Sequence, residues 1–440
     1  MTNLEIGIAS FPVLLALIFL RIPIGLAMLL CGLVGSWLVT GSTVPILSKL
    51  KSETFSTFSS YSLSIIPLFL LMGQFASLGG MSQSLFKAAQ TWLGHRRGGV
   101  AMAAIGACAG FGAICGSSLA TAATMAQVAL PELRRYGYSG ALATGTLAAG
   151  GTLGILIPPS VVLVIYAILA EQNIAKLFLA AFVPGILAAI GYMIAISIYV
   201  RLNPESAGSS ARAPYGERFR ALADVWPVVL IFLAVVGGIY FGWFTPTEGA
   251  AVGAAGTGLV AWKNGGLNRS TFIQSILATA SATGMIFFIV FGAAFYNSFL
   301  ALSQLPQEAA AYISGQGFNP WIVMVAILIL YLLLGCVMDS LSMILLTIPI
   351  FYPIVITLDY GLNIEEFSIW FGILVLIVVE VGLITPPVGM NLFVINSMDR
   401  STPIVQTYRG VVPFVISDII RTIVLTAFPV ISLFMVRWLY

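Results

Sequence analysis

The sequence has few charged residues and a single histidine. Only 8% of its 440 residues are charged, 59% are hydrophobic, and the mean hydropathy is +1.04. A soluble protein carries about 25% charged residues, so a soluble enzyme, a nucleic-acid-binding protein and a disordered scaffold are excluded. The composition predicts a polytopic membrane protein. At about 20 residues for each membrane-spanning helix, the length allows roughly ten spans.

Residues that carry metal, redox or hydrolytic chemistry are also scarce. His95 is the only histidine, and the four cysteines (Cys31, Cys108, Cys115 and Cys336) lie in apolar stretches without metal-ligand spacing. Haem, iron–sulfur and zinc sites therefore have no support. There is no P-loop for ATP and no HExxH motif. We expect a protein that is not an enzyme and has no organic cofactor.

Long apolar runs predict the membrane helices. They cover residues 5–20, 24–40, 62–80, 139–170, 177–200, 226–243, 248–262, 272–300, 367–397 and 411–436. The first run has no basic residues before it and no small-residue cleavage site after it. We therefore expect it to stay as a membrane helix rather than to be removed as a signal peptide.

Two further apolar regions, 100–131 and 320–357, are predicted to enter and leave the membrane on the same side. Basic residues flank the first at both ends, whereas no Lys or Arg occurs between residues 270 and 399 around the second. Because basic loops remain in the cytoplasm, each region is interpreted as a re-entrant hairpin, and the two have opposite orientations. Two ordinary pairs of spans are the alternative. The same rule places both termini outside, which conflicts with Lys49, Lys51 and Lys176.

Each hairpin is followed by a long apolar run that contains an unusual break. The first hairpin contains a Gly112 to Ser118 stretch and is followed by Gly154-x-x-x-Pro158-Pro159. The second contains Gly335 to Ser342 and is followed by Gly382-x-x-x-Pro386-Pro387. Two successive prolines remove two amide donors and break a helix. In lipid, the freed carbonyl groups must meet protein, water or an ion.

This order predicts two repeats of opposite orientation, because each half crosses the membrane an odd number of times. Residues 1–200 hold scaffold helices (1–80), a hairpin (100–131), a broken helix (139–170) and a closing helix (177–200). A cytoplasmic linker covers 201–224. Residues 225–440 repeat the order as scaffold helices (226–300), hairpin (320–357), broken helix (367–397) and closing helix (411–436). Inverted repeats with broken helices are typical of secondary transporters, in which unwound carbonyls bind cations and helix N-termini bind anions. A channel or a membrane enzyme is the alternative class.

Several stretches together resemble the large membrane subunit of tripartite ATP-independent periplasmic (TRAP) transporters. The resemblance covers essentially the whole chain and lies in Ile66–Gly73, Gly112–Ser118, Gly154–Ser160, Lys176–Gly185, Phe244–Ala250, Gly335–Ser342 and Gly382–Asn391. It implies an all-α polytopic membrane protein with about 10–11 transmembrane helices, two oppositely oriented re-entrant hairpins and an elevator-type inverted repeat. It also implies a location in the bacterial inner membrane.

The resemblance further implies Na⁺-coupled import of a small organic anion, such as a C4-dicarboxylate or sialic acid. A periplasmic substrate-binding protein would deliver the anion, and a separate small four-helix subunit would support the permease. Na⁺ would be the coupling ion, with no other cofactor. A stand-alone Na⁺/dicarboxylate symporter without a binding protein is the alternative.

The resemblance implies two Na⁺ sites and a substrate site between the hairpin tips. The first Na⁺ site would use Gly112, Ser117, Gly154, Ile157 and Pro158. The second would use Gly335, Asp339, Gly382, Thr385 and Val388, and the substrate would meet Ser118, Ser340 and Asn391. Hydroxyl and carbonyl oxygens suit a hard cation.

Asp339 and four more polar residues lie within or beside the apolar runs. Asp339 is the only carboxylate at a hairpin tip, and a simple helix cap is its alternative role. Glu380 either positions the second site or bonds to another helix. Asp418 and Arg421 are spaced to form a pair, and Glu248 is placed to cap a helix.

Overall fold

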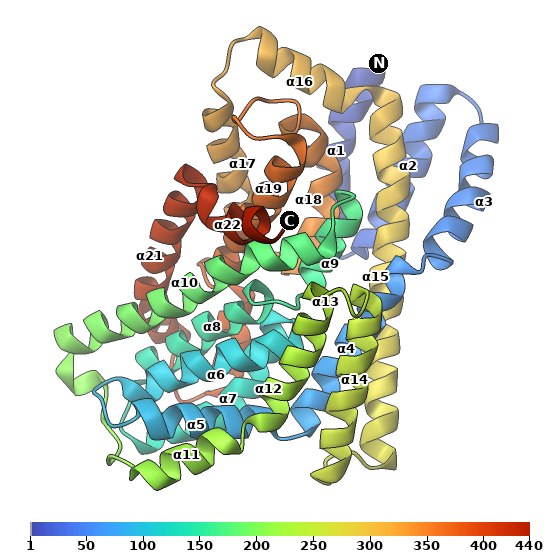
Figure 1. Cartoon of the computed structure of the whole chain (residues 1–440). Helices are drawn as coiled ribbons and strands as arrows, with labels where there is room; N and C mark the ends of the chain where they lie inside the picture. Colours follow the sequence, from blue (N-terminus) through green and yellow to red (C-terminus); the bar gives the residue numbers. More distant parts are fainter. Residues whose placement is uncertain (1) are drawn as a thin grey trace.

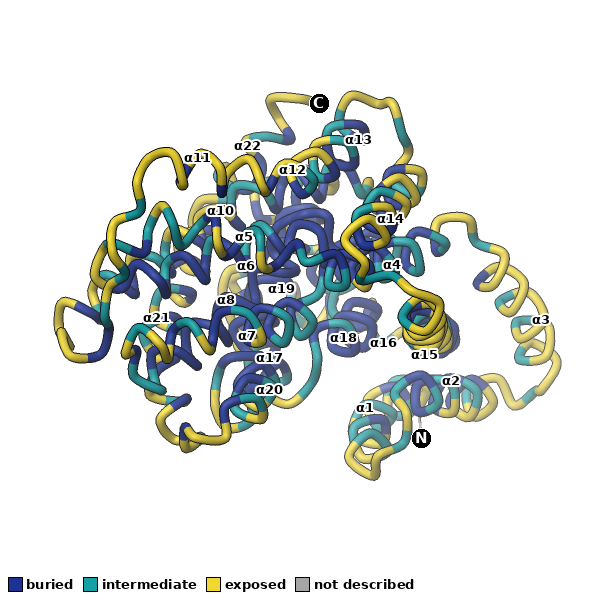
Figure 2. Tube along the Cα trace, turned by 90° about the horizontal axis from the view of Figure 1, so that it is seen from below, coloured by how far each residue is buried: buried dark blue, intermediate teal, exposed yellow. Residues whose placement is uncertain are grey.

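The computed structural model describes residues 2–440, and every regular element within them is a helix (Figure 1). The helices form two regions. Seen along the axis of α15 (Arg269–Ser303), α1 (Asn3–Phe19), α2 (Ile24–Thr40) and α3 (Val44–Phe58) gather with α15 on one side, apart from the dense centre of buried residues (Figure 2).

The scaffold contains the helices that come first in each predicted repeat. The first repeat supplies α1, α2, α3, a short 3₁₀ turn at Ser62–Ser64 and α4 (Ile65–Leu78). The second supplies α12 (Trp226–Phe232), a π-helical turn at Leu233–Gly237, α13 (Gly238–Tyr240), α14 (Pro246–Lys263) and α15. α15 packs along α2, and α14 packs along α4. Glycine permits the closest approach: a Cβ atom added to Gly32 would lie 2.7 Å from the Tyr296 amide nitrogen.

The two predicted hairpins coincide with two pairs of short helices. α6 (Gly99–Cys115) and α7 (Ser118–Arg135) form the first, and α17 (Pro320–Gly335) and α18 (Ser340–Val355) form the second. At a rise of 1.5 Å per residue each helix is roughly 25 Å long, shorter than the roughly 30 Å hydrocarbon core. The helices therefore have the length of re-entrant arms.

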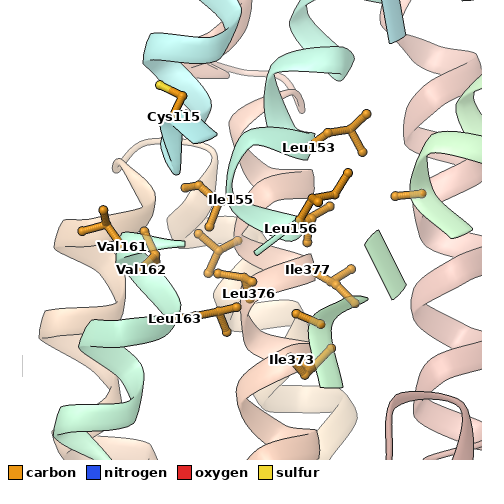
Figure 3. Packing of buried hydrophobic residues seen from close by; sticks show 14 of the residues in the cluster. Cys115, Leu153, Ile155, Leu156, Val161, Val162, Leu163, Ile373, Leu376 and Ile377 are labelled. Carbon is orange, nitrogen blue, oxygen red and sulfur yellow. The ribbon is translucent and has the colours of Figure 1, made fainter. Parts of the chain in front are cut away.

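Each hairpin is followed by a broken helix. α8 (Gly140–Leu156) and α9 (Val161–Leu169) are bent by 45° at the first Pro-Pro pair, and α19 (Ile364–Leu383) and α20 (Met390–Met398) flank the second. Both Pro-Pro peptide bonds are cis. α19 is the central helix, because every residue from Phe367 to Leu383 is buried. Figure 3 shows side chains of the first broken helix beside Ile373, Leu376 and Ile377 of α19, so the two broken helices share one core.

The closing helices differ between the two halves. α10 (Ile174–Leu202) is continuous, whereas the predicted closing helix 411–436 is two helices, α21 (Ile404–Ala427) and α22 (Val430–Leu439), separated at Pro429. Proline lacks an amide donor and ends the hydrogen-bonded ladder. Lys176, whose position conflicts with the charge rule, forms an ion pair with Glu365 (2.5 Å).

Four helices lie where the apolar runs predicted none, namely α3, α5 (Met81–Leu93), α11 (Tyr215–Ala223) and α16 (Leu305–Gly315). Helix α5 lies between the last scaffold helix of the first repeat and the first hairpin, and α11 lies within the predicted linker 201–224. Figure 1 shows α5 and α11 at one end of the molecule and α16 at the other. These helices carry polar residues throughout, so a search for apolar runs passes over them.

Membrane-spanning length is found in several of the described helices. α10, α15, α19 and α21 are long and apolar enough to cross a membrane, and the count rises to seven if each bent pair forms one span. Shorter apolar helices include α1, α2, α6, α17 and α18. The chain is therefore a multi-pass helical membrane protein.

Candidate functional site

The tip of the first hairpin lies on the break of the first broken helix. α6 ends at Gly116, whose φ of +64° favours glycine, and Ser117 caps α7 by accepting a hydrogen bond from the Ala120 amide. Gly112 packs directly on Gly154: a Cβ atom added to Gly112 would lie 2.6 Å from the Gly154 Cα atom. Glycine at both positions is what lets the two backbones touch.

Three residues of the predicted first Na⁺ site, Gly112, Ser117 and Gly154, lie at this contact. A Cβ atom on Gly154 would lie 2.7 Å from the Ser117 carbonyl oxygen, and Ile157 and Pro158 are the first residues after α8. The sequence reasoning missed Thr121, whose buried hydroxyl also faces Gly154 and has no hydrogen-bond partner within residues 2–440. The four-residue spacing from Ser117 to Thr121, which puts both on one helix face, was the available signal.

The second hairpin repeats the contact with its own broken helix. A Cβ atom added to Gly382 would lie 2.6 Å from the Gly335 Cα atom. In addition, the Gly389 amide donates to the Cys336 carbonyl oxygen (3.0 Å), which fastens the break to the hairpin tip. The same backbone geometry is thus built twice.

The remaining residues of the predicted second site lie around this contact with their polar atoms partly engaged. Asp339 caps α18, with one carboxylate oxygen accepting from the Ser342 amide (3.0 Å). The Thr385 hydroxyl donates to the Val381 carbonyl oxygen (2.6 Å), and Val388 lies in the break between α19 and α20. The alternative role of Asp339 as a cap is confirmed, and its role as a Na⁺ ligand stays a prediction.

A small pocket of about 90 Å³ lies between the two hairpin tips. Both tips line it, and scaffold residues Leu70 of α4 and Ile286 of α15 close it on another side. Its tip residues are Gly116, Ser117, Ser118, Leu119, Asp339, Ser340 and Leu341. The N-termini of α7 and α18 both begin at this pocket, where unpaired amides and the positive ends of the helix dipoles favour an anion.

Glu380 joins the two tips beneath this pocket. Its carboxylate is fully buried in α19 and accepts hydrogen bonds from Ser118 through one oxygen and from Ser340 through the other (2.6 Å). The two serines are the first residues of α7 and α18. No Lys or Arg pairs with Glu380 among the described residues. The predicted hydrogen bonding between helices is therefore confirmed, and a role of Glu380 in positioning the second site stays a prediction.

Asn391, the third predicted substrate contact, does not line the pocket. It is fully buried in α20, and its side-chain amide donates to the Ala148 carbonyl oxygen of α8 (3.2 Å). This geometry gives no support to a substrate role for Asn391.

A second buried polar network includes Thr152 of α8. Asp418 and Arg421 form the predicted ion pair (2.9 Å). The Tyr192 hydroxyl donates to Asp418 (2.7 Å) and lies 2.9 Å from the Thr152 hydroxyl. The network links both closing helices to the first broken helix. Glu248 also makes the predicted capping box at the start of α14.

The oxygen-rich contacts fit a hard monovalent cation better than a transition metal. Where each hairpin meets its broken helix, the polar atoms are carbonyl groups, hydroxyls and one carboxylate, which are ligands for hard cations. No cluster of three His, Cys, Asp or Glu side chains occurs within residues 2–440.

A solved membrane transporter has a similar fold. The structure matches the solved structure of the YdaH transporter of Alcanivorax borkumensis with a TM-score of 0.61, covering 87% of this chain and 89% of that one. The sequences are only 14% identical, so this likeness concerns the fold alone.

Sequence comparison gives the family. Residues 11–431 match the family described as the DctM component of tripartite ATP-independent periplasmic transporters, and the chain belongs to it. It is 36% identical to the C4-dicarboxylate TRAP transporter large permease protein DctM of Pseudomonas aeruginosa, covering 89% of this chain and 90% of the relative. It is 29% identical to the sialic acid TRAP transporter permease protein SiaT of Haemophilus influenzae, covering 96% of this chain and 66% of the relative. The predicted family is thus confirmed.

Proposed function

We propose that this chain is the permease of a Na⁺-coupled importer of a small organic anion. The observation that carries the proposal is the bridge from Ser118 through Glu380 to Ser340, which joins both hairpin tips beneath one pocket. An anion there would meet two helix N-termini, which attract negative charge. Relatives are named for C4-dicarboxylates, sialic acid and ectoine, which supports a small organic substrate without selecting one.

Na⁺ would bind where each hairpin meets its broken helix. At the first contact the Ser117 and Thr121 hydroxyls and backbone carbonyls would surround it, and at the second the Asp339 carboxylate would contribute charge. Glycine pairs hold the backbones close enough for carbonyl groups of both elements to share one ion. Coupling then follows, because an ion that bridges hairpin and broken helix stabilises the tips that receive the anion.

The two regions of the fold support an elevator motion in the inner membrane. Helices α1, α2, α3 and α15 stand to one side of the hairpins, broken helices and closing helices (Figure 2). The core would slide against this scaffold and carry the pocket across. A small membrane subunit would cover the exposed apolar side chains of the scaffold, including Ile8, Val34 and Phe55. A periplasmic binding protein would deliver the anion.

Uptake into proteoliposomes tests the proposal. The chain would be reconstituted with the small subunit encoded beside it, with and without a Na⁺ gradient and with and without the neighbouring binding protein. We expect uptake only when both are present. Na⁺-driven uptake without the binding protein would instead establish a stand-alone symporter. Uptake with the binding protein but independent of Na⁺ would refute the coupling.

A further inference from the structure

A pocket lined by three arginines lies outside the transport site, at the end of α10. It has a volume of about 430 Å³. Arg96 and Arg97 come from the turn that leads into the first hairpin, and Arg201 comes from the last turn of α10. Figure 1 shows this turn close to the C-terminal end of α10, at the edge of the molecule. Three cations from two separate segments therefore converge on one space.

The positive charge of this pocket is not balanced by the protein. Among the described residues, none of its three arginines forms an ion pair or a side-chain hydrogen bond, whereas Arg134 and Arg437 do pair with carboxylates. The acidic residue nearest in sequence, Glu205, pairs with none of them. Guanidinium groups bind phosphate through paired hydrogen bonds, so the pocket suits a phosphate group.

A lipid-facing stripe on α10 leads to the same pocket. Ile190, Ile194 and Ile198 recur every four residues and are 48%, 53% and 52% exposed. α10 is one of the four helices with full membrane-spanning length and apolarity. Arg201 follows this stripe at the helix end, where a membrane helix reaches the headgroup region and arginine side chains meet lipid phosphates.

We propose that Arg96, Arg97 and Arg201 bind the phosphate of an anionic phospholipid whose acyl chains lie along Ile190, Ile194 and Ile198. Phospholipid acyl chains can pack along this apolar stripe and free phosphate cannot, so the stripe favours the phospholipid. Such a lipid would fasten the entrance of the first hairpin to the end of α10. The site is independent of the proposed transport function.

Native mass spectrometry of the full chain in a neutral detergent tests this site. Phosphatidylglycerol and phosphatidylcholine with the same acyl chains would be titrated against wild-type protein and the R96Q/R97Q/R201Q variant. We expect tighter binding of phosphatidylglycerol to the wild type. The variant should lose about fivefold in affinity for each arginine, the typical contribution of one basic residue near an anionic membrane surface. Arg400→Gln, an exposed arginine outside the pocket, is the matched control and should bind as the wild type does.

A second variant and a competitor identify the ligand. Ile194→Gln/Ile198→Gln changes only exposed side chains, and it should weaken phosphatidylglycerol binding severalfold while thermal unfolding remains unchanged. Equal affinity of wild type for both lipids, or wild-type affinity in the arginine variant, would overturn the proposal. Displacement of the lipid by millimolar inorganic phosphate, with no effect of the isoleucine changes, would overturn it in favour of a free-phosphate site.

Discussion

The two Pro-Pro breaks have the same backbone geometry but carry different side chains. In both, a hairpin glycine touches a glycine of the broken helix, and a Cβ atom on one would lie 2.6 Å from the partner Cα atom. The first break carries hydroxyl groups (Ser117 and Thr121), whereas Asp339 lies at the second. Backbone geometry has been kept in both copies, and charge is placed in only one.

The position two residues before the broken-helix glycine shows this difference most directly. In the first repeat it is Thr152, which bonds within a network that ends on Asp418. In the second repeat it is Glu380, which reaches across to serines of both tips. Asp418 also belongs to the second half. The second repeat thus supplies the buried carboxylates for both copies.

The largest expected loss of uptake would come from disrupting the glycine–glycine contact that both repeats contain. Gly112→Ala and Gly382→Ala should each reduce uptake by about 100-fold, because the added methyl group forces the hairpin away from its broken helix by an amount on the scale of 1 Å. Uptake in proteoliposomes at equal protein content measures this. Gly284→Ala, where an added methyl meets nothing within 4 Å, is the control. Full activity in either glycine variant would show that its contact is dispensable.

The next largest loss of uptake would show that Glu380 and Thr152 have different roles. Glu380→Ala removes the shared acceptor of two buried hydroxyls and should lower uptake about 10–100-fold, since each buried hydroxyl left without its acceptor costs about 1–3 kcal/mol. Thr152→Ala should cost only a few fold. A double-mutant cycle with Ser118→Ala should be non-additive, because both residues belong to one bridge. Additive losses would mean that the bridge does not act in transport.

A smaller effect, on the Na⁺ dependence of uptake, would distinguish the two helix caps Ser117 and Asp339. Asp339→Asn should raise the Na⁺ concentration for half-maximal uptake about tenfold, because a negative charge beside the proposed ion is lost, a change of about 1.4 kcal/mol. Ser117→Ala removes only a neutral hydroxyl and should raise it about threefold. Both variants should insert into the membrane normally. An unchanged Na⁺ dependence in Asp339→Asn would remove this residue from the site.

The smallest effect concerns the ion pair that joins the halves near the base of the first hairpin. Burial opposes ionisation of Asp399, but hydrogen bonds from Ser401 and Thr402 and the charge of Arg134 hold its pKa below the usual value. Its stabilisation is therefore present at neutral pH and is lost as pH falls through that lowered pKa. Asp399→Asn should lower the free energy of unfolding by about 0.2–1 kcal/mol at pH 7 and by less at acidic pH.

Thermal unfolding at both pH values checks this expectation. Arg135→Gln alters a more exposed pair on the same helix and should leave stability unchanged. A deficit in Asp399→Asn that grows on acidification would contradict the ion-pair explanation.

Residues that act through the backbone were predictable from sequence, and residues that act across long distances were not. The Gly and Pro-Pro pattern located both breaks, because those residue types determine where a helix can pass closely or must stop. The bridge made by Glu380 depends on partners 262 and 40 residues away, which no local pattern indicates. Asn391 belongs to a strong motif, yet it faces α8 instead of the pocket. Polar helices such as α5 contain no continuous apolar run, so hydropathy does not indicate them.

The short hairpin arms also imply an order of assembly during synthesis. An arm of 16–18 residues is at the short limit for a membrane span, and a tip carrying Ser117 or Asp339 is costly in lipid without partners. The partner of each tip, α8–α9 or α19–α20, is made only after its hairpin. Each hairpin therefore reaches its final depth only once the following broken helix is in place. A ribosome stalled before residue 154 would leave the first hairpin without the glycine that it packs against.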